Sequence, residues 1–205
     1  MNAAGHVELA DVERAAALVF RRQSYRGATM QEVADEVGLH KASLYHHIKS
    51  KQSVLVSIAK TAINNSLLEL ESICRDEDLE PVQKLWQAVH MQVTEITKHP
   101  DQIAVFTMYL NEISDDKMRE EFIARRKRYE DLYLQIVADC LGVQTTSADA
   151  KLTSLAILGM CNWTLNWYHP GGSIKPAALA AKFADMATRA ISTADINGAA
   201  LSAVR

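Results

Sequence analysis

Glycine and proline are scarce in this chain, which has eight glycines and four prolines among 205 residues. Because both residues favour turns, their scarcity argues against a loop-rich protein and favours a helical one. Hydrophobic residues make up 48% of the chain and charged residues 23%, which is typical of a folded protein with a sizeable core. The length predicts one small module and one medium-sized domain.

Cysteines and long apolar runs are also few. Cys74, Cys140 and Cys161 are odd in number and widely spaced, so we expect neither a disulfide framework nor a cysteine metal site. No apolar stretch reaches the ~18 residues that a membrane span requires, and the N-terminus lacks a basic segment followed by an apolar one. The sequence therefore predicts a cytoplasmic protein that is neither exported nor embedded in a membrane.

An overall excess of positive charge is absent as well, since the formal net charge is −3. The charge is uneven, however: residues 21–60 contain seven Lys or Arg and three acidic side chains, which leaves +4 there and −7 in the rest of the chain. A basic segment on an acidic body is expected when only that segment meets phosphates.

What the chain does contain is a repeated helical spacing of apolar residues, and no stretch alternates with the period of a strand. A first stripe predicts a helix at about residues 6–22, and it consists of Val12, Ala16, Val19 and Phe20. Further helices are expected at about residues 50–75, 81–98, 101–113, 116–141, 148–169 and 176–192. The sequence predicts an all-α protein.

Two short helices are predicted between the first helix and residue 50. Thr29 precedes an apolar stripe and Glu32 stands three residues later, which is a capping box and begins a helix. Gly38 can take the left-handed conformation that ends this helix, and a short segment at residues 40–48 follows. Two short helices joined by a tight glycine turn form a helix-turn-helix motif.

Residues 12–55, VERAAALVFRRQSYRGATMQEVADEVGLHKASLYHHIKSKQSVL, resemble the N-terminal module of TetR-family repressors. The most specific stretch is 42–51, ASLYHHIKSK. The resemblance is sharp over about the first 65 residues, and beyond them it rests on helix layout. It implies a three-helix DNA-binding domain at residues 6–66, a helical ligand-binding and dimerisation domain at 67–205, and a transcription repressor released by a small molecule.

Four residues depart from the family pattern. Ser24 stands where glycine is common, so the end of the first helix must tolerate a side chain. His40 replaces a small hydroxyl residue and is expected to alter which DNA sequence is read. Ile48 replaces the usual Phe, and Gln52 replaces the usual Glu. None of these changes removes the scaffold.

The candidate DNA contacts fall into two sets. The N-terminal end of a recognition helix lies near base edges in the major groove, which makes His40, Lys41 and Ser43 the base-reading candidates, with Ala42 allowing close approach. The second set suits phosphate oxygens and should position the protein rather than specify sequence. It comprises Thr29, Tyr45, His46 and Lys51.

Some of these residues have a plainer alternative. Tyr45 is expected to lie partly in the core, beside Leu44 and Ile48. His46 and His47 are not predicted to bind a metal, because adjacent helical side chains diverge and no Cys or carboxylate completes a ligand spacing. We expect no metal and no other cofactor.

The segment 152–167, LTSLAILGMCNWTLNW, is apolar on nearly all sides and too short to span a bilayer. It is expected to be buried on two faces, one against its own domain and one against a partner subunit. In TetR-like proteins the last two long helices form a four-helix dimer interface, so the resemblance implies a homodimer that reads a palindromic operator.

The candidate effector-binding residues are Phe106, Met108, Arg125, Arg128, Asn162, Trp163, Asn166 and Trp167. For the tryptophans and amides the sequence leaves two roles open: packing in the core or dimer interface, or lining a ligand pocket. For Phe106 and Met108, as for Tyr109 and Tyr133, burial in the core is favoured. For the basic run 125–128, a solvated face with ion pairs is favoured over a cationic mouth for an anionic ligand.

Residues 166–172, NWYHPGG, resemble a segment of TetR-like regulators of lipid catabolism, which implies an acyl-coenzyme A thioester as effector. A neutral hydrophobic or aromatic inducer is the alternative. An enzyme is not expected, because the usual nucleophile, metal and phosphate-binding motifs are missing. A helical interaction protein that does not bind DNA would leave the basic segment unexplained.

Overall fold

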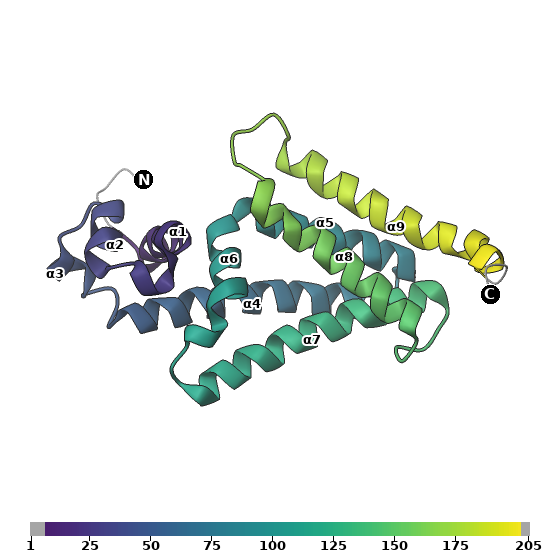
Figure 1. The fold of residues 1–205 in the computed structure, drawn as a ribbon, viewed down its shortest axis with the longest axis horizontal. Helices are drawn as coiled ribbons and strands as arrows, with labels where there is room; N and C mark the ends of the chain where they lie inside the picture. Colours follow the sequence, from purple (N-terminus) through teal and green to yellow (C-terminus); the bar gives the residue numbers. More distant parts are fainter. Residues whose placement is uncertain (1–6, 202–205) are drawn as a thin grey trace. The chain divides into compact units, whose positions relative to one another are not determined.

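The computed structural model describes residues 7–201, and it describes side chains for residues 7–192. Over this part the chain forms α-helices and one 3₁₀ helix without a strand, which confirms the predicted all-α class (Figure 1). The elements are α1 Leu9–Gly27, α2 Met30–Val37, α3 Lys41–Leu44, α4 Lys51–Arg75, α5 Pro81–Lys98, α6 Pro100–Tyr109, η1 Leu110–Glu112, α7 Asp116–Leu141, α8 Ala148–Trp167 and α9 Pro176–Leu201. None of the described helices is long and apolar enough to cross a membrane.

Several helix ends differ from the predicted ones. Helix α6 begins at Pro100, whose missing N–H costs nothing in the first turn, and its last part continues as the 3₁₀ helix η1. Helix α8 ends at Trp167. Helix α9 extends beyond residue 192 to Leu201, in keeping with the high helix propensity of its alanines. The predicted start of the first helix, His6, lies outside the described residues.

Helix α1 contains a kink at the position where the sequence departs from the family glycine. Ser24 has φ 65° and ψ 159°, a backbone conformation that favours glycine. The backbone N–H of Ala28 donates to the Ser24 carbonyl at 3.1 Å, so the chain closes a last turn after the kink. The first, regular part of α1 therefore ends close to the predicted residue 22.

The chain divides into two compact units. The first comprises Met1–Asn65 and His99–Arg126, and the second comprises Ser66–Lys98 and Lys127–Arg205. The predicted domain border after residue 66 lies beside the first division, but residues 99–126 associate with the N-terminal residues.

This association has a visible cause, which is the packing of α6 against α1. The Tyr109 hydroxyl donates to the backbone carbonyl of Phe20 at 3.2 Å. The Arg21 guanidinium pairs with the Asp101 carboxylate at 3.0 Å. Residues 99–126 are thus held to α1 by a hydrogen bond from a side chain to the backbone and by an ion pair between two side chains. Both contacts join residues that are far apart in the sequence.

The core of the first unit is formed by the apolar stripes of its short helices. The predicted stripe of α1 is buried throughout, as are Val33 and Ala34 of α2. Leu44 of α3 is fully buried, and so is Val54 of α4. The helices of the helix-turn-helix segment are therefore mounted on one shared apolar core.

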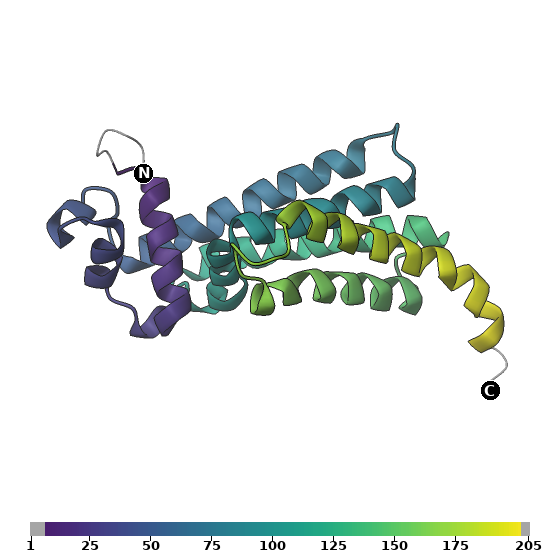
Figure 2. The same ribbon diagram turned by 90° about the horizontal axis from the view of Figure 1, so that it is seen from above.

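The second unit is organised around α5, which packs against both α8 and α9 (Figures 1 and 2). Leu85, Val89 and Val93 of α5 are fully buried. The buried Tyr133 of α7 donates its hydroxyl to the Ala88 carbonyl at 2.7 Å. Helix α5 is therefore the central element of this unit.

Helix α8 buries only one of its faces within the single chain, and this face includes Ile157, Cys161 and Thr164. On other positions of the helix, Leu155 and Trp163 are 65% and 66% exposed. The predicted burial of a second face therefore does not occur within the chain itself and would need a partner.

Candidate nucleic-acid interface

The first helix of the motif begins at a reciprocal cap. The backbone N–H of Glu32 donates to Thr29 Oγ1 at 3.3 Å, and the backbone N–H of Thr29 donates to Glu32 Oε2 at 2.8 Å. The Thr29 hydroxyl also donates to the same carboxylate oxygen at 2.9 Å, and these bonds lower the pKa of Glu32. The predicted capping box is confirmed, and the Thr29 hydroxyl proton is engaged within it.

The turn between α2 and α3 depends on Gly38, which adopts φ 74° and ψ 29°. The N–H of Gly38 donates to the Asp35 carbonyl at 3.2 Å, and the N–H of Leu39 donates to the Ala34 carbonyl at 2.9 Å. These bonds satisfy carbonyls that a helix end leaves without partners. The predicted left-handed glycine turn is confirmed.

Helix α3 is anchored by buried side chains, while most of its other side chains are exposed. Leu44 is fully buried and Ile48 is 6% exposed, so both side chains fix the segment to the core. The N–H of Ile48 donates to the Leu44 carbonyl at 3.2 Å, so turns continue beyond the four residues of regular helix. The predicted segment 40–48 is thus a continuous series of helical turns that packs on the core, although its regular helix is shorter than expected.

The exposed residues of this segment occupy positions around the buried Leu44 and Ile48. Lys41 and Tyr45 are one turn apart, as are Ala42 and His46, and all four are exposed. His40, at the N-terminal end, is exposed too, whereas Ser43 is half-buried. Tyr45 is 45% exposed, so its ring is partly buried and partly accessible, as expected. The recognition face, as we call the exposed residues 40–42, 45 and 46, carries hydrogen-bond donors, acceptors and a cation, which are the kinds of group that contact base edges and phosphates in other proteins.

Lys51 occupies a different environment from the recognition face. Its ammonium donates to the carbonyl oxygens of Ala28 at 2.6 Å and Arg26 at 3.3 Å. It also lies 4.7 Å from the centre of the Tyr25 ring. Burial lowers the pKa of Lys51, while the charges of Glu32 and Glu112 oppose this shift. Lys51 therefore binds the backbone carbonyls at the loop between α1 and α2 and stabilises this loop. One N–H of its ammonium remains for a further contact.

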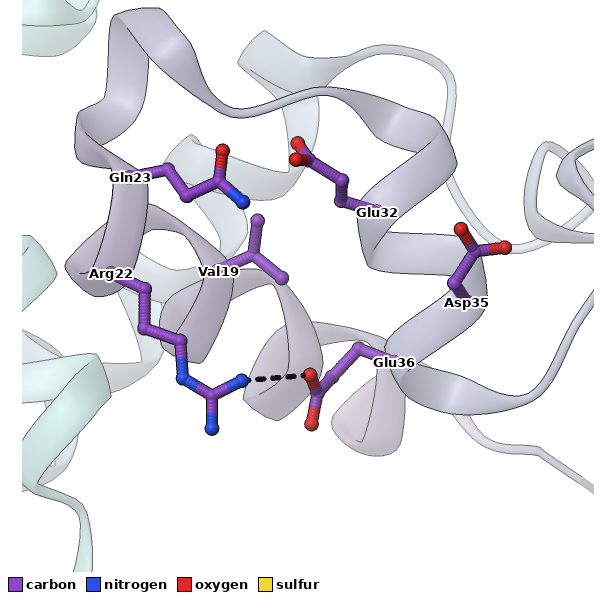
Figure 3. A pocket seen from close by; sticks show the side chains of 6 residues that line it. All are labelled: Val19, Arg22, Gln23, Glu32, Asp35 and Glu36. Carbon is purple, nitrogen blue, oxygen red and sulfur yellow. Dashed lines mark hydrogen bonds and ion pairs between the residues drawn. The ribbon is translucent and has the colours of Figure 1, made fainter.

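An acidic groove lies between α1 and α2. Glu32, Asp35 and Glu36 of α2 line it opposite α1. Figure 3 shows Glu32 and Glu36 extending toward the side chains of α1, with the Arg22 guanidinium paired to Glu36 at 3.1 Å. Three carboxylates against one guanidinium give this groove a negative potential, which disfavours phosphates. The groove thus marks a side of the motif that is unsuited to DNA.

The candidate effector-binding residues are divided between the two units. Phe106, Met108 and Arg125 belong to the first unit, and the other five belong to the second. Phe106 is buried as expected, but Met108 is 63% exposed, so its expected burial in the core is wrong for the single chain. It lies on the solvent side of α6, where hydrophobic spacing alone does not decide which side chain is covered.

The amides and tryptophans of α8 have mixed surroundings. Asn162 accepts a hydrogen bond from the Gln92 amide at 3.0 Å, and Asn166 donates to the carbonyl of Trp163 at 3.3 Å. Trp167 lies 6.4 Å from the Phe183 ring, centre to centre. The amides are thus satisfied in part by protein.

The basic run of α7 makes several polar contacts of its own. Arg125 donates to Asn64, Arg128 lies 3.5 Å from the Glu71 carboxylate, and Lys127 pairs with Asp131 at 3.2 Å. The i,i+4 ion pair is the arrangement expected for a solvated helix face. Arg125 and Arg128 are nevertheless exposed, which leaves them accessible to an anion.

Sequence reasoning missed the buried polar residues of α5. Gln92 is 7% exposed, and its Oε1 has no hydrogen-bond partner among the described residues. Nothing in the local sequence distinguishes this glutamine from a solvated one. The only signal available is its position on an otherwise apolar stripe, with Ala88 and Ile96 one turn away on either side.

Comparison with known proteins identifies the chain. Residues 14–58 match the family described as "Bacterial regulatory proteins, tetR family", and residues 78–191, more than half of the chain, match the "Tetracyclin repressor-like, C-terminal domain". The chain belongs to the TetR family. It is accordingly a helix-turn-helix transcriptional regulator, as the recognition face indicates.

Individual TetR-family relatives agree with this assignment. The HTH-type transcriptional repressor KstR2 of Mycolicibacterium smegmatis is 24% identical over 163 residues, which cover 78% of each chain. The solved structure of the TetR-family regulator PfmR from Thermus thermophilus is 26% identical, with a TM-score of 0.72 over 87% of this chain and 97% of that one. KstR2 of Mycobacterium tuberculosis shares the fold, with a TM-score of 0.79 at 19% identity over 91% of this chain and 97% of that one. These relatives are regulators of transcription, which are not enzymes.

Proposed function

We propose that this TetR-family protein is a cytoplasmic repressor that binds a palindromic operator as a homodimer and is released by a small molecule. The observation that carries the proposal is the recognition face, on which Lys41, Tyr45 and His46 are exposed above the buried Leu44 and Ile48. A helix that enters the major groove needs an exposed polar face and buried side chains that fix it to the core of its domain.

Within this interface His40, Lys41 and Ser43 read base edges, and Ala42 permits close approach. Tyr45 and His46 bind phosphate oxygens from the same face. Thr29 and Lys51 bind phosphate more weakly than their residue types suggest, because their polar atoms are already engaged in the α2 cap and the α1–α2 loop. Selection of genomic fragments by the purified protein tests the proposal: we expect enrichment of an inverted repeat, and enrichment of no common sequence would contradict it.

Dimerisation is proposed through α8 and α9. Leu155 and Trp163 of α8 and Met186 of α9 are apolar and exposed in the single chain. Exposed apolar side chains on these long helices favour a second copy, since an isologous contact would remove them from water. Light scattering at micromolar concentration should give twice the mass of the chain, and the mass of a single chain would contradict the proposal.

An acyl-coenzyme A thioester is proposed as the effector. The resemblance of residues 166–172 to regulators of lipid catabolism supports it, and so does the exposure of Arg125 and Arg128, which suit phosphates. A structural neighbour with the same fold, AibR, is described in complex with isovaleryl coenzyme A and operator DNA, at 24% identity over 87% of this chain and 96% of that one, with a TM-score of 0.66. The alternative is a neutral hydrophobic or aromatic inducer, for which the tryptophans would suffice.

Titration of the operator complex decides between the two effector classes. Acyl-coenzyme A thioesters should release the DNA, whereas the corresponding free acids should not. Arg125→Ala and Arg128→Ala should raise the concentration needed for release, and Lys127→Ala, which removes a neighbouring cation paired with Asp131, is the matched control. Release by neutral compounds alone, or release unchanged in both arginine variants, would contradict the thioester proposal and leave DNA binding intact.

A further inference from the structure

A second groove lies in the second unit, between α4 and α5, and it contains none of the candidate effector-binding residues. Its volume is ≈ 330 Å³, which is near the lower end of the range for small-ligand sites. Ile73 and Met91 provide buried apolar surface in its wall. An apolar floor of this size can hold the body of a small organic molecule.

An aromatic pair forms part of the groove. The Trp86 indole and the His90 imidazole stack with their centres 4.9 Å apart and their planes 14° from parallel. The indole N–H donates to the Asp185 carboxylate at 2.9 Å, which fixes the ring in this orientation. A rigid aromatic wall attracts cations through the negative faces of its rings.

The charge of the groove is also suited to a cation. Glu69 and Glu95 line it from the two helices, and Lys98 lies at the limit of an ion pair, 3.9 Å from Glu95. The Lys98 side chain is 59% exposed, so this pair is weak. Glu69 has no hydrogen-bond or ion-pair partner within residues 7–192. The two carboxylates therefore leave an uncompensated negative charge beside the aromatic wall.

A further polar group lies at this groove. Thr94 lines it, and its Oγ1 is buried without a hydrogen-bond partner among the described residues. A buried hydroxyl without a partner is costly unless a ligand or water supplies one.

We infer that the groove between α4 and α5 binds an organic cation with an apolar body, such as an aromatic or alkyl amine. The ammonium would lie against Glu69 and Glu95 and within reach of the Thr94 hydroxyl, and the apolar body would rest on Ile73, Met91 and the face of the Trp86–His90 pair. An anion would be repelled by the carboxylates, so this site is distinct from the one proposed for a thioester.

Calorimetric titration of the full-length protein with phenethylammonium, 2-phenylethanol and phenylacetate tests the inference. These probes share the aromatic body and differ in charge. The ammonium should bind with a millimolar or lower Kd and at least about tenfold more tightly than the alcohol or the acid, as expected from the pairing of its charge with two partly exposed carboxylates. Equal binding of the alcohol, or no saturable binding of the ammonium, would overturn the inference.

Variants locate the site. The double substitution Glu69→Gln and Glu95→Gln should weaken ammonium binding about tenfold, and Trp86→Leu should also weaken it. Glu77→Gln, which removes an exposed carboxylate from the loop before α5, is the control and should bind as the native protein does. Circular dichroism and thermal midpoints establish that the variants remain folded. Unchanged ammonium affinity in the folded double variant would place the cation elsewhere and contradict the inference.

Discussion

Helix α3 in the first unit and helix α8 in the second unit expose opposite kinds of surface. On α3, the buried side chains are apolar and the exposed ones are mostly polar, as Leu44 and Lys41 show. On α8, the polar Thr164 is buried while the apolar Leu155 and Trp163 are exposed. The first surface is therefore suited to the charged and hydrated groove of DNA, whereas the second is suited to another protein surface.

The largest expected effect comes from placing a charge on the apolar surface of α8. Leu155→Glu would bury a carboxylate in each half of the proposed dimer interface, and on the order of 4 kcal/mol or more of association free energy should be lost. Light scattering should then report a monomer. Leu68→Glu on α4 is the matched control, because Leu68 is 63% exposed and Leu155 is 65% exposed. A dimer that survives Leu155→Glu as well as it survives Leu68→Glu would contradict the assignment of this surface.

Truncation of Leu44, the buried side chain that fixes α3 to the core, should have the next largest effect. Leu44→Ala leaves a cavity in the core of the first unit and should lower the free energy of unfolding by about 2–5 kcal/mol, with loss of DNA binding. Tyr45→Ala, one residue further and exposed, should weaken DNA binding with little change in stability. Chemical denaturation and mobility-shift titration measure the two quantities separately. If both variants lose stability equally, the division of α3 into an anchored and an exposed side is wrong.

The glycine turn of the motif should be sensitive to a side chain. Gly38→Ala places a Cβ on a residue with φ 74°, which should lower the free energy of unfolding by about 1 kcal/mol, although there is open space around the added atom. The effect therefore comes from the backbone and not from a clash. A stability equal to that of the native protein in thermal denaturation would show that the turn can relax.

The opposite substitution at the kink of α1 should stabilise the protein. Ser24→Gly relieves a strained backbone with φ 65° and ψ 159°, and a gain of about 1 kcal/mol is expected after the entropy cost of glycine. The Ser24 hydroxyl oxygen accepts a bond from the Gly27 N–H at 3.3 Å, whose loss limits the gain. A lower thermal midpoint for Ser24→Gly than for the native protein would mean that this bond outweighs the strain.

The smallest effect is expected at Lys51. Lys51→Ala should weaken binding to all DNA sequences alike and reduce the slope of log affinity against log salt by about one or less, because part of its ammonium is committed to the carbonyls of Arg26 and Ala28. Lys51→Arg, which keeps the charge, serves as the comparison. A change in sequence preference upon Lys51→Ala would mean that this residue reads bases.

The helix-turn-helix motif could be predicted closely because its signals are local. The cap between Thr29 and Glu32 and the turn at Gly38 each depend on residues within five positions of one another, and backbone chemistry decides both. The strained Ser24 is likewise indicated by a residue type that stands out from the family pattern.

The rest could not be predicted because it depends on which helices become neighbours. The bond from Tyr109 to Phe20 joins residues 89 positions apart, and it brings part of the predicted C-terminal domain into the first unit. The exposure of Met108 and Trp163 has the same origin, since an apolar side chain is covered only if another element reaches it. The groove that contains Glu69 and Trp86 has no sequence motif at all.

Selection from a random DNA library at a fixed salt concentration, with the native protein and Lys41→Ala in parallel, tests the central claim most directly. The native protein should select an inverted repeat, and the variant should select a repeat with altered preference at the base positions that Lys41 reads, at a cost of about 1–3 kcal/mol for the original sequence. Identical selected sequences and equal affinities for both proteins would contradict the claim that the exposed face of α3 recognises DNA.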